Sequence, residues 1–78
     1  MPRITVRYFA VLRERRGLEA ETVDVTDGES AATVYRRLFP ELAAHLPVAF
    51  AIDRRYVPGD TRVEDGIELA LLPPIGGG

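Results

Sequence analysis

The residues best suited to carry chemistry lie at the end of the sequence, in Leu71-Leu72-Pro73-Pro74-Ile75-Gly76-Gly77-Gly78. Glycine has no Cβ, so a glycine run can pass through a channel that is too narrow for side chains. An α-carboxyl group is ionised at pH 7 and is a poor acyl donor until it is activated, most simply as an acyl-adenylate made from ATP. We therefore expect Gly78 to carry the reactive carboxylate, on an arm formed by Pro73, Pro74, Ile75, Gly76 and Gly77.

The machinery for that activation is not visible in the chain. It contains no phosphate-binding loop of the GxxxxGK[ST] type, and no helix follows Gly76-Gly77-Gly78. It has no cysteine, and its single histidine, His45, has no second candidate ligand or base near it in the sequence. We expect a chain that is not an enzyme on its own and binds no metal or cofactor, with ATP used by a separate activating enzyme. The competing interpretation of a glycine-rich end is an unstructured terminus without a function.

Length and charge narrow the class of protein. Seventy-eight residues suffice for one small domain, and 10 basic against 12 acidic residues give a net charge of −2, which argues against a nucleic-acid-binding protein. No apolar run approaches the ~20 residues of a membrane span, and no signal peptide precedes the first strand-like segment, so we expect a cytoplasmic protein. All ten basic residues are arginine. That bias fits the base composition of the source, and it also removes side-chain amines that could attack an activated terminus.

The elements that must position the tail follow from periodicity and turn signals. Alternation predicts a strand over residues 3–9, and a helix capped by Ser30 is expected over residues 31–38. The further expected elements are a loop or helical turn over 10–17, a turn over 40–46, and strands over 21–25, 48–52, 56–57 and 67–72. This β-β-α-β-β-β order predicts an α+β protein of β-grasp (ubiquitin-like) architecture, with a mixed sheet of about four or five strands and one main helix on one face. We expect a domain over residues 1–72 and a flexible, extended tail over 73–78.

The parity of the first and last strands predicts a surface patch. Leu69 and Leu71 should face the helix, so Leu72 should face the other way, as should Phe9 after the inward Tyr8. If the two strands are parallel neighbours, Phe9 and Leu72 meet at the root of the tail, and Tyr56 could join them. Exposed apolar clusters on small domains mark partner sites. The alternative is a strand-end bulge that buries one of the two.

Three stretches carry a family resemblance: Phe9-Ala10 followed by Leu12-Arg13-Glu14, then Val63-Glu64-Asp65-Gly66, and above all the terminal Leu-Leu-Pro-Pro-Ile-Gly-Gly-Gly. They resemble the MoaD/ThiS sulfur-carrier family, in the branch of molybdopterin synthase small subunits. The resemblance makes Gly77-Gly78 the functional pair and places Gly76 in a variable slot. The chain departs from many relatives in having Leu71-Leu72 where they carry an aromatic pair.

The resemblance implies a function. An E1-like adenylyltransferase would adenylate Gly78, and a sulfur donor enzyme would convert it to a thiocarboxylate. The tail would then enter the large catalytic subunit of molybdopterin synthase, within a heterotetramer, and deliver sulfur to a pterin precursor in molybdenum cofactor biosynthesis. Phe9, Leu72 and Tyr56 take the positions of the subunit interface.

Other functions stay open. The carrier could serve thiamine, cysteine or tRNA thiolation, the chain could be a ubiquitin-like protein modifier, or it could be a plain adaptor. The arginine pairs Arg15-Arg16 and Arg54-Arg55 are interpreted as solvated surface, or as charge contacts to an acidic partner.

Overall fold

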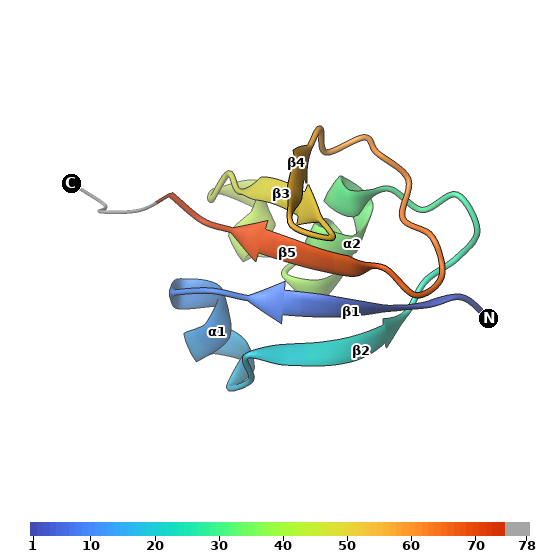
Figure 1. Ribbon diagram of the computed structural model, residues 1–78. Coiled ribbons are helices and arrows are strands. Elements are labelled where there is room, and N and C mark those ends of the chain that lie inside the picture. The colour runs from blue at the N-terminus through green and yellow to red at the C-terminus, as the bar shows by residue number, and fades with distance from the viewer. Residues whose placement is uncertain (75–78) are drawn as a thin grey trace.

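A computed structural model describes residues 1–74 of the chain. It contains a five-stranded mixed sheet in the order β2-β1-β5-β3-β4. The first and last strands, β1 and β5, are parallel neighbours, and every other pair is antiparallel (Figure 1). The elements are β1 Arg3–Tyr8, α1 Val11–Arg16, β2 Ala20–Asp24, α2 Ala31–Leu38, a 3-10 turn Leu42–Ala44, β3 Ala49–Ile52, β4 Arg55–Val57 and β5 Glu68–Leu72. The predicted β-grasp architecture is confirmed, and the last strand lies at the centre of the sheet beside the first.

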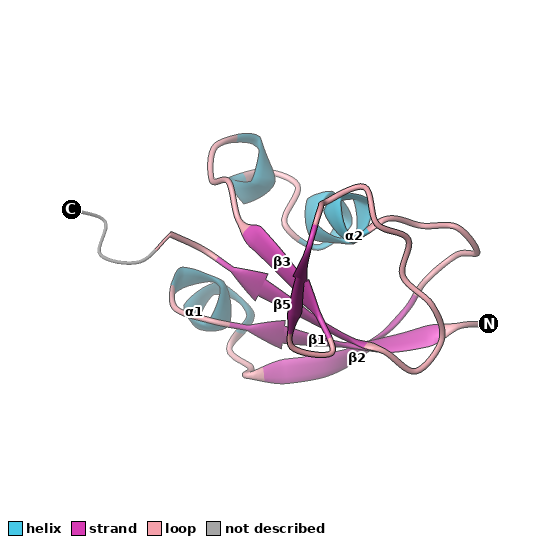
Figure 2. Ribbon diagram, turned by 45° about the horizontal axis from the view of Figure 1, so that its top comes forward, coloured by secondary structure: helices cyan, strands magenta, loops and turns pink. Residues whose placement is uncertain are grey.

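The helix α2 lies across one face of the sheet (Figure 2). It begins where expected, because the Ser30 hydroxyl accepts a hydrogen bond from the Thr33 amide at 3.1 Å. It ends at Leu38, before Phe39 and Pro40, since a residue that precedes proline is disfavoured in a helix. The buried residues of α2 are Ala31, Val34 and Tyr35, which form the side of the helix that packs against the strands.

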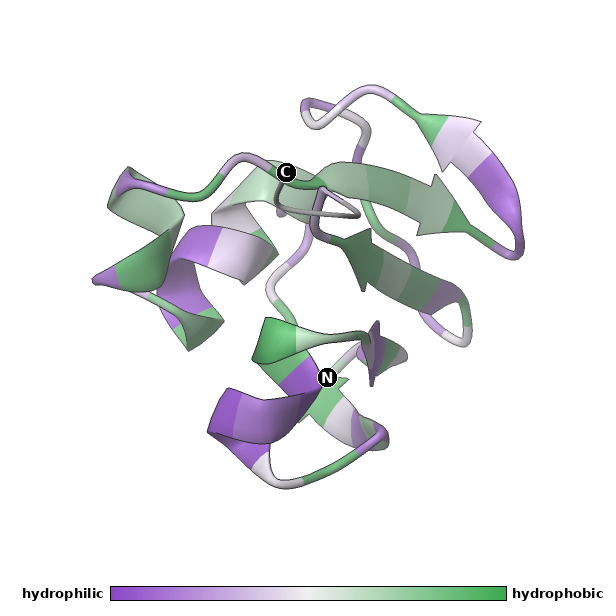
Figure 3. Ribbon diagram, turned by 90° about the vertical axis from the view of Figure 1, so that its left-hand side faces the viewer, coloured by the Kyte–Doolittle hydropathy of each residue, from purple (hydrophilic) through white to green (hydrophobic). Residues whose placement is uncertain are grey.

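The core lies between α2 and the inward side chains of the strands. Both β1 and β5 alternate strictly, with every second side chain buried. The core includes Ile4, Val6 and Tyr8 of β1, Leu69 and Leu71 of β5, and Ala31, Val34 and Tyr35 of α2. Figure 3 shows the hydrophobic character of β3 and β5, in contrast to the hydrophilic start of the edge strand β4. The inward face predicted for the first and last strands is confirmed.

Several predicted boundaries were off by one residue, and one element was underestimated. The first strand ends at Tyr8 rather than Phe9, and the last begins at Glu68, although Ile67 still packs against the core. Residues 10–17, expected as a loop or helical turn, contain α1, whose Leu12 is fully buried. A six-residue helix is too short to show helical periodicity, which is why Leu12 was not predicted as a core residue.

Candidate functional site

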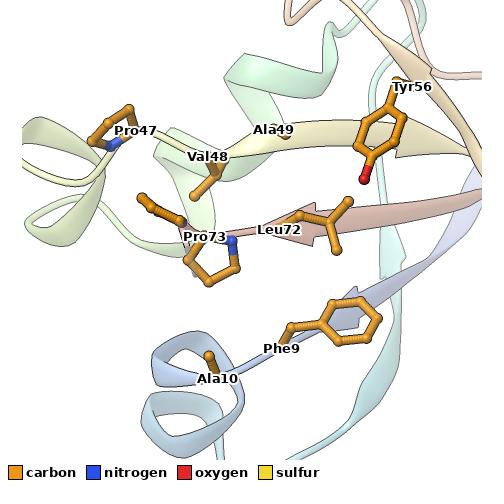
Figure 4. Close-up of a pocket in the computed structure, with 9 residues that line it drawn as sticks. Phe9, Ala10, Pro47, Val48, Ala49, Tyr56, Leu72 and Pro73 are labelled. Carbon is orange, nitrogen blue, oxygen red and sulfur yellow. The ribbon is translucent and has the colours of Figure 1, made fainter. Parts of the chain in front are cut away.

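An apolar groove lies where β5 ends, on the side of the sheet that α2 does not cover (Figure 4). Leu72 lies between Phe9 and Tyr56 in this view, so the three residues of the expected patch do come together. Phe9 is 38% exposed and Tyr56 is 78% exposed, while Leu72 is half-buried. The groove is lined by Phe9, Ala10, Pro47, Val48, Ala49, Tyr56, Leu72, Pro73 and Pro74.

Strand register explains why these side chains meet. Tyr8 is opposite Leu71 in the parallel pair of β1 and β5, so the next residue of each strand, Phe9 and Leu72, points away from the core. On the other side of β5, Ala49 is opposite Leu72, which brings the start of β3 to the groove. The alternative of a strand-end bulge that buries one of the pair is wrong.

Phe9 is kept at the surface by a sharp corner in the chain. The next residue, Ala10, has φ 51° and ψ −125°, a conformation that costs a residue with a Cβ about 1–3 kcal/mol. The corner is closed by hydrogen bonds from the Leu12 amide to the Phe9 carbonyl at 3.0 Å and from the Glu14 amide to the Ala10 carbonyl at 3.1 Å. Burial of Leu12 anchors the helix that follows. The chain therefore turns away directly after Phe9 and leaves its ring at the groove.

A polar cluster fixes α1 against the sheet beside this corner. The Tyr8 hydroxyl donates to Glu21 Oε2 at 2.6 Å, and Arg16 Nε donates to the same oxygen at 2.7 Å. The hydrogen bond from Tyr8, aided by Arg16, holds the pKa of the Glu21 carboxyl below its usual value, and burial together with Glu21 raises the pKa of Tyr8. The Arg16 guanidinium also stacks over the Tyr8 ring, 5.7 Å from its centroid. These three groups bind one another, so their role is to hold the corner.

The chain leaves β5 through the groove. Pro73 is buried and Pro74 is exposed, and both line the groove. Pro73, which was predicted as the first residue of the extended arm, therefore still packs against the domain. The other predicted tail residues, Ile75, Gly76, Gly77 and the reactive Gly78, lie outside the described residues.

Part of the groove was not predicted. Pro47, Val48 and Ala49 form one wall because β3 pairs with β5, and no pairing was predicted for those two strands. The apolar run from Val48 to Ile52 could have indicated a central strand beside β5, since an edge strand of that character would be an aggregation hazard.

Among residues 1–74, no three His, Cys, Asp or Glu side chains converge in a way that could hold a metal ion. In the same part of the chain, no helix has the length and apolar character needed to cross a membrane.

Comparisons with known proteins identify the same family that the sequence motifs resemble. The model of the ThiS family matches residues 6–78. A Chlamydomonas reinhardtii protein named molybdopterin synthase sulfur carrier subunit is 33% identical over 84 aligned positions, which cover 96% of this chain and 98% of that protein.

Solved structures share the fold at lower identity. Small archaeal modifier protein 1 of Haloferax volcanii is 20% identical with a TM-score of 0.80, over 96% of this chain and 100% of that one. A chain in the complex of subunits 1 and 2 of the Helicobacter pylori molybdopterin-converting factor is 24% identical with a TM-score of 0.62, over 97% of this chain and 99% of that one. The family model, which spans nearly the whole chain, shows that this protein belongs to the ThiS family, the MoaD/ThiS group of sulfur carriers that its terminal motif predicted.

Proposed function

We propose that this protein is the sulfur-carrier subunit of a molybdopterin synthase. The observation that carries the proposal is the apolar groove of Phe9, Leu72 and Tyr56 at the point where the chain leaves β5 towards its glycines. A docking surface at the root of a narrow tail fits a protein that must place its last residue inside a partner's active site. The relative named as a molybdopterin synthase sulfur carrier subunit supports this choice of pathway.

In this proposal the chain supplies a carrier group and its partners supply the catalysis. The Gly78 carboxylate attacks the α-phosphate of ATP in an E1-like adenylyltransferase, releasing pyrophosphate and forming an acyl-adenylate. A sulfur donor enzyme then provides sulfur at the oxidation level of sulfide, which displaces AMP and leaves a thiocarboxylate at Gly78. The large catalytic subunit receives the tail, the sulfur forms a bond to a pterin precursor, and water cleaves the C–S bond to Gly78, which returns Gly78 to the carboxylate. The groove would hold the carrier on its partner while that transfer takes place.

Intact-mass spectrometry tests the carrier chemistry. After incubation with the cognate adenylyltransferase, ATP and a sulfur source, the full chain should gain the mass difference between sulfur and oxygen. A variant lacking Gly77-Gly78 is the control and should gain nothing. Absence of the mass gain in the intact chain would contradict the proposal.

Binding to the large subunit tests the pathway. A stable complex between this chain and the purified large subunit of molybdopterin synthase is expected, in line with the subunit 1 and 2 complex of the Helicobacter pylori factor. If the thiocarboxylate forms but no complex does, the carrier serves another sulfur recipient, such as thiamine, cysteine or tRNA thiolation.

A second candidate is a ubiquitin-like protein modifier, which the likeness in fold to small archaeal modifier protein 1 favours. It predicts that Gly-Gly remnants of this chain are found on lysines of other proteins. Because this chain has no lysine, it cannot form lysine-linked chains on itself. Proteomic detection of such remnants, together with failure to bind the large subunit, would favour the modifier over the carrier.

A further inference from the structure

Two ion pairs neutralise charged side chains on the helix-free side of the sheet. Arg3 Nε contacts Asp24 Oδ1 at 2.9 Å, and Arg7 Nε contacts Glu68 Oε2 at 3.0 Å. Arg54 makes no side-chain hydrogen bond or ion pair with any residue of the 1–74 segment. Its side chain is exposed to solvent, so it is free to meet a partner protein.

Arg54 lies beside the apolar groove. A second hollow on the same side of the sheet shares Phe9, Tyr56 and Leu72 with the groove, and Arg54 lines it together with the Arg7–Glu68 pair. The Arg7–Glu68 pair neutralises itself, so Arg54 is the charged residue of this lining that has no ion-pair partner within residues 1–74. A partner that covers Phe9 and Tyr56 would also cover or approach the Arg54 guanidinium.

The backbone at Arg54 is strained for an arginine. It occupies the second position of the two-residue turn between β3 and β4, with φ 72°, and Asp53 occupies the first with φ 49°. Turns of this kind need positive φ at both positions and favour Asn-Gly or Asp-Gly. Asp53 has a structural reason to be there, because its carboxylate accepts a hydrogen bond from the Glu68 amide at 3.0 Å. Glycine would suit the fold better than Arg54 does.

An unpaired charge, held at a strained position beside an exposed apolar groove, indicates a role outside the folded domain. We infer that Arg54 is a specificity-determining residue that pairs with a carboxylate on the partner protein that covers the groove. The partner surface would combine an apolar centre, which receives Phe9 and Tyr56, with an acidic side chain at its margin. Arginine suits this role because its planar guanidinium can bind a carboxylate through two parallel hydrogen bonds. The inference rests on the proposed function, with the large subunit of molybdopterin synthase as the partner.

Two substitutions separate binding from folding. Arg54→Gly should raise the thermal midpoint, since glycine adopts positive φ without strain, and should still weaken binding to the purified large subunit about 10-fold. Arg54→Gln should weaken binding to a similar extent without the gain in stability. Arg36→Gln is the matched control, because Arg36 is exposed on α2, on the opposite side of the sheet, and its replacement changes the net charge equally. Affinities are measured by calorimetry with the full chain at low and high salt.

The salt series adds a second readout. The affinity of the wild-type chain should fall more steeply with ionic strength than that of Arg54→Gln, because screening weakens a charge pair. Equal affinities for wild type and both Arg54 variants would overturn the inference and leave the proposed function standing. Failure of the wild-type chain itself to bind the large subunit would overturn the proposed function, and the inference with it.

Discussion

The two faces of the sheet use neighbouring residues of β5 for different purposes. Leu71 faces α2 and is 0% exposed, whereas Leu72, the same residue type, is half-buried on the helix-free face. The apolar surface of Leu71 is fully buried in the core, so it contributes only to folding. The apolar surface of Leu72 stays available next to Phe9 and Tyr56. Because side chains alternate between the two faces of a strand, β5 contributes to both the core and the exposed groove.

Polar groups show the same contrast. On the side of the core, Glu29 is almost fully buried and accepts hydrogen bonds from Arg37 at 2.9 and 3.1 Å and from the Thr26 amide at 3.1 Å. Within residues 1–74, no buried side-chain polar atom lacks a hydrogen-bond partner. On the helix-free face, Arg54 lacks such a partner in the same segment and has a strained backbone. The hydrogen bonds of Glu29 therefore serve the fold, whereas the exposed Arg54 side chain beside the groove has no such role within the described residues.

The largest expected effect separates the two leucines. Leu71→Ala should lower the free energy of unfolding by about 2–5 kcal/mol, because it leaves a cavity in the core. Leu72→Ala should lower it by less than about 1.5 kcal/mol, since its side chain is already half solvated. Urea denaturation of both variants measures the difference. Equal losses would mean that the helix-free face is part of the core after all.

The next effect concerns Glu29. Burial alone would raise the pKa of its carboxyl, but the hydrogen bonds from Arg37 and the Thr26 amide outweigh burial and hold the pKa below 4.5. Glu29→Gln should lower the free energy of unfolding at pH 7 by about 1.5–3 kcal/mol, through loss of charge-assisted hydrogen bonds.

The pH dependence gives the sign of that effect. A lowered folded-state pKa stabilises the protein above the unfolded value of 4.5, and the contribution is lost as the pH falls through the folded pKa. The gap between wild type and Glu29→Gln should thus narrow below pH 4.5 in a series of urea titrations. A gap that stays constant down to low pH would show that the pair contributes no charge-dependent stability.

The smallest expected effect is a gain. Ala10→Gly should raise the free energy of unfolding by about 1 kcal/mol, because glycine relieves the positive φ of 51° at the corner after Phe9. Ala44→Gly, at an exposed position of the 3-10 turn, is a control in which no strain is relieved and should not stabilise the protein. A drop in the melting temperature of Ala10→Gly would mean that the corner is not strained.

Sequence reasoning worked where one physical signal dominated. Strict alternation placed Phe9 and Leu72 on the outer face, and the Ser30 cap located the start of α2. These features depend on local periodicity and on side-chain chemistry at a single position, so they can be predicted without knowledge of the tertiary contacts.

The remaining features depend on tertiary context. The wall formed by Pro47 and Val48 requires the register between β3 and β5, and burial of Leu12 requires the docking of a six-residue helix. Positive φ at Ala10 and Arg54 could not be anticipated, because neither residue type favours it. Strain at these two positions is imposed by the surrounding structure, and it is found next to the groove.

The central claim is that the groove is the docking surface for the large subunit of molybdopterin synthase. Phe9→Ala and Leu18→Ala test it most directly, because the two side chains are exposed to a similar extent, 38% and 44%, and only Phe9 lines the groove. Calorimetric titration into the large subunit should show affinity for Phe9→Ala reduced about 30-fold, the loss typical of a central aromatic contact, and affinity for Leu18→Ala unchanged. Wild-type affinity for Phe9→Ala, or an equal loss for both variants, would contradict the account.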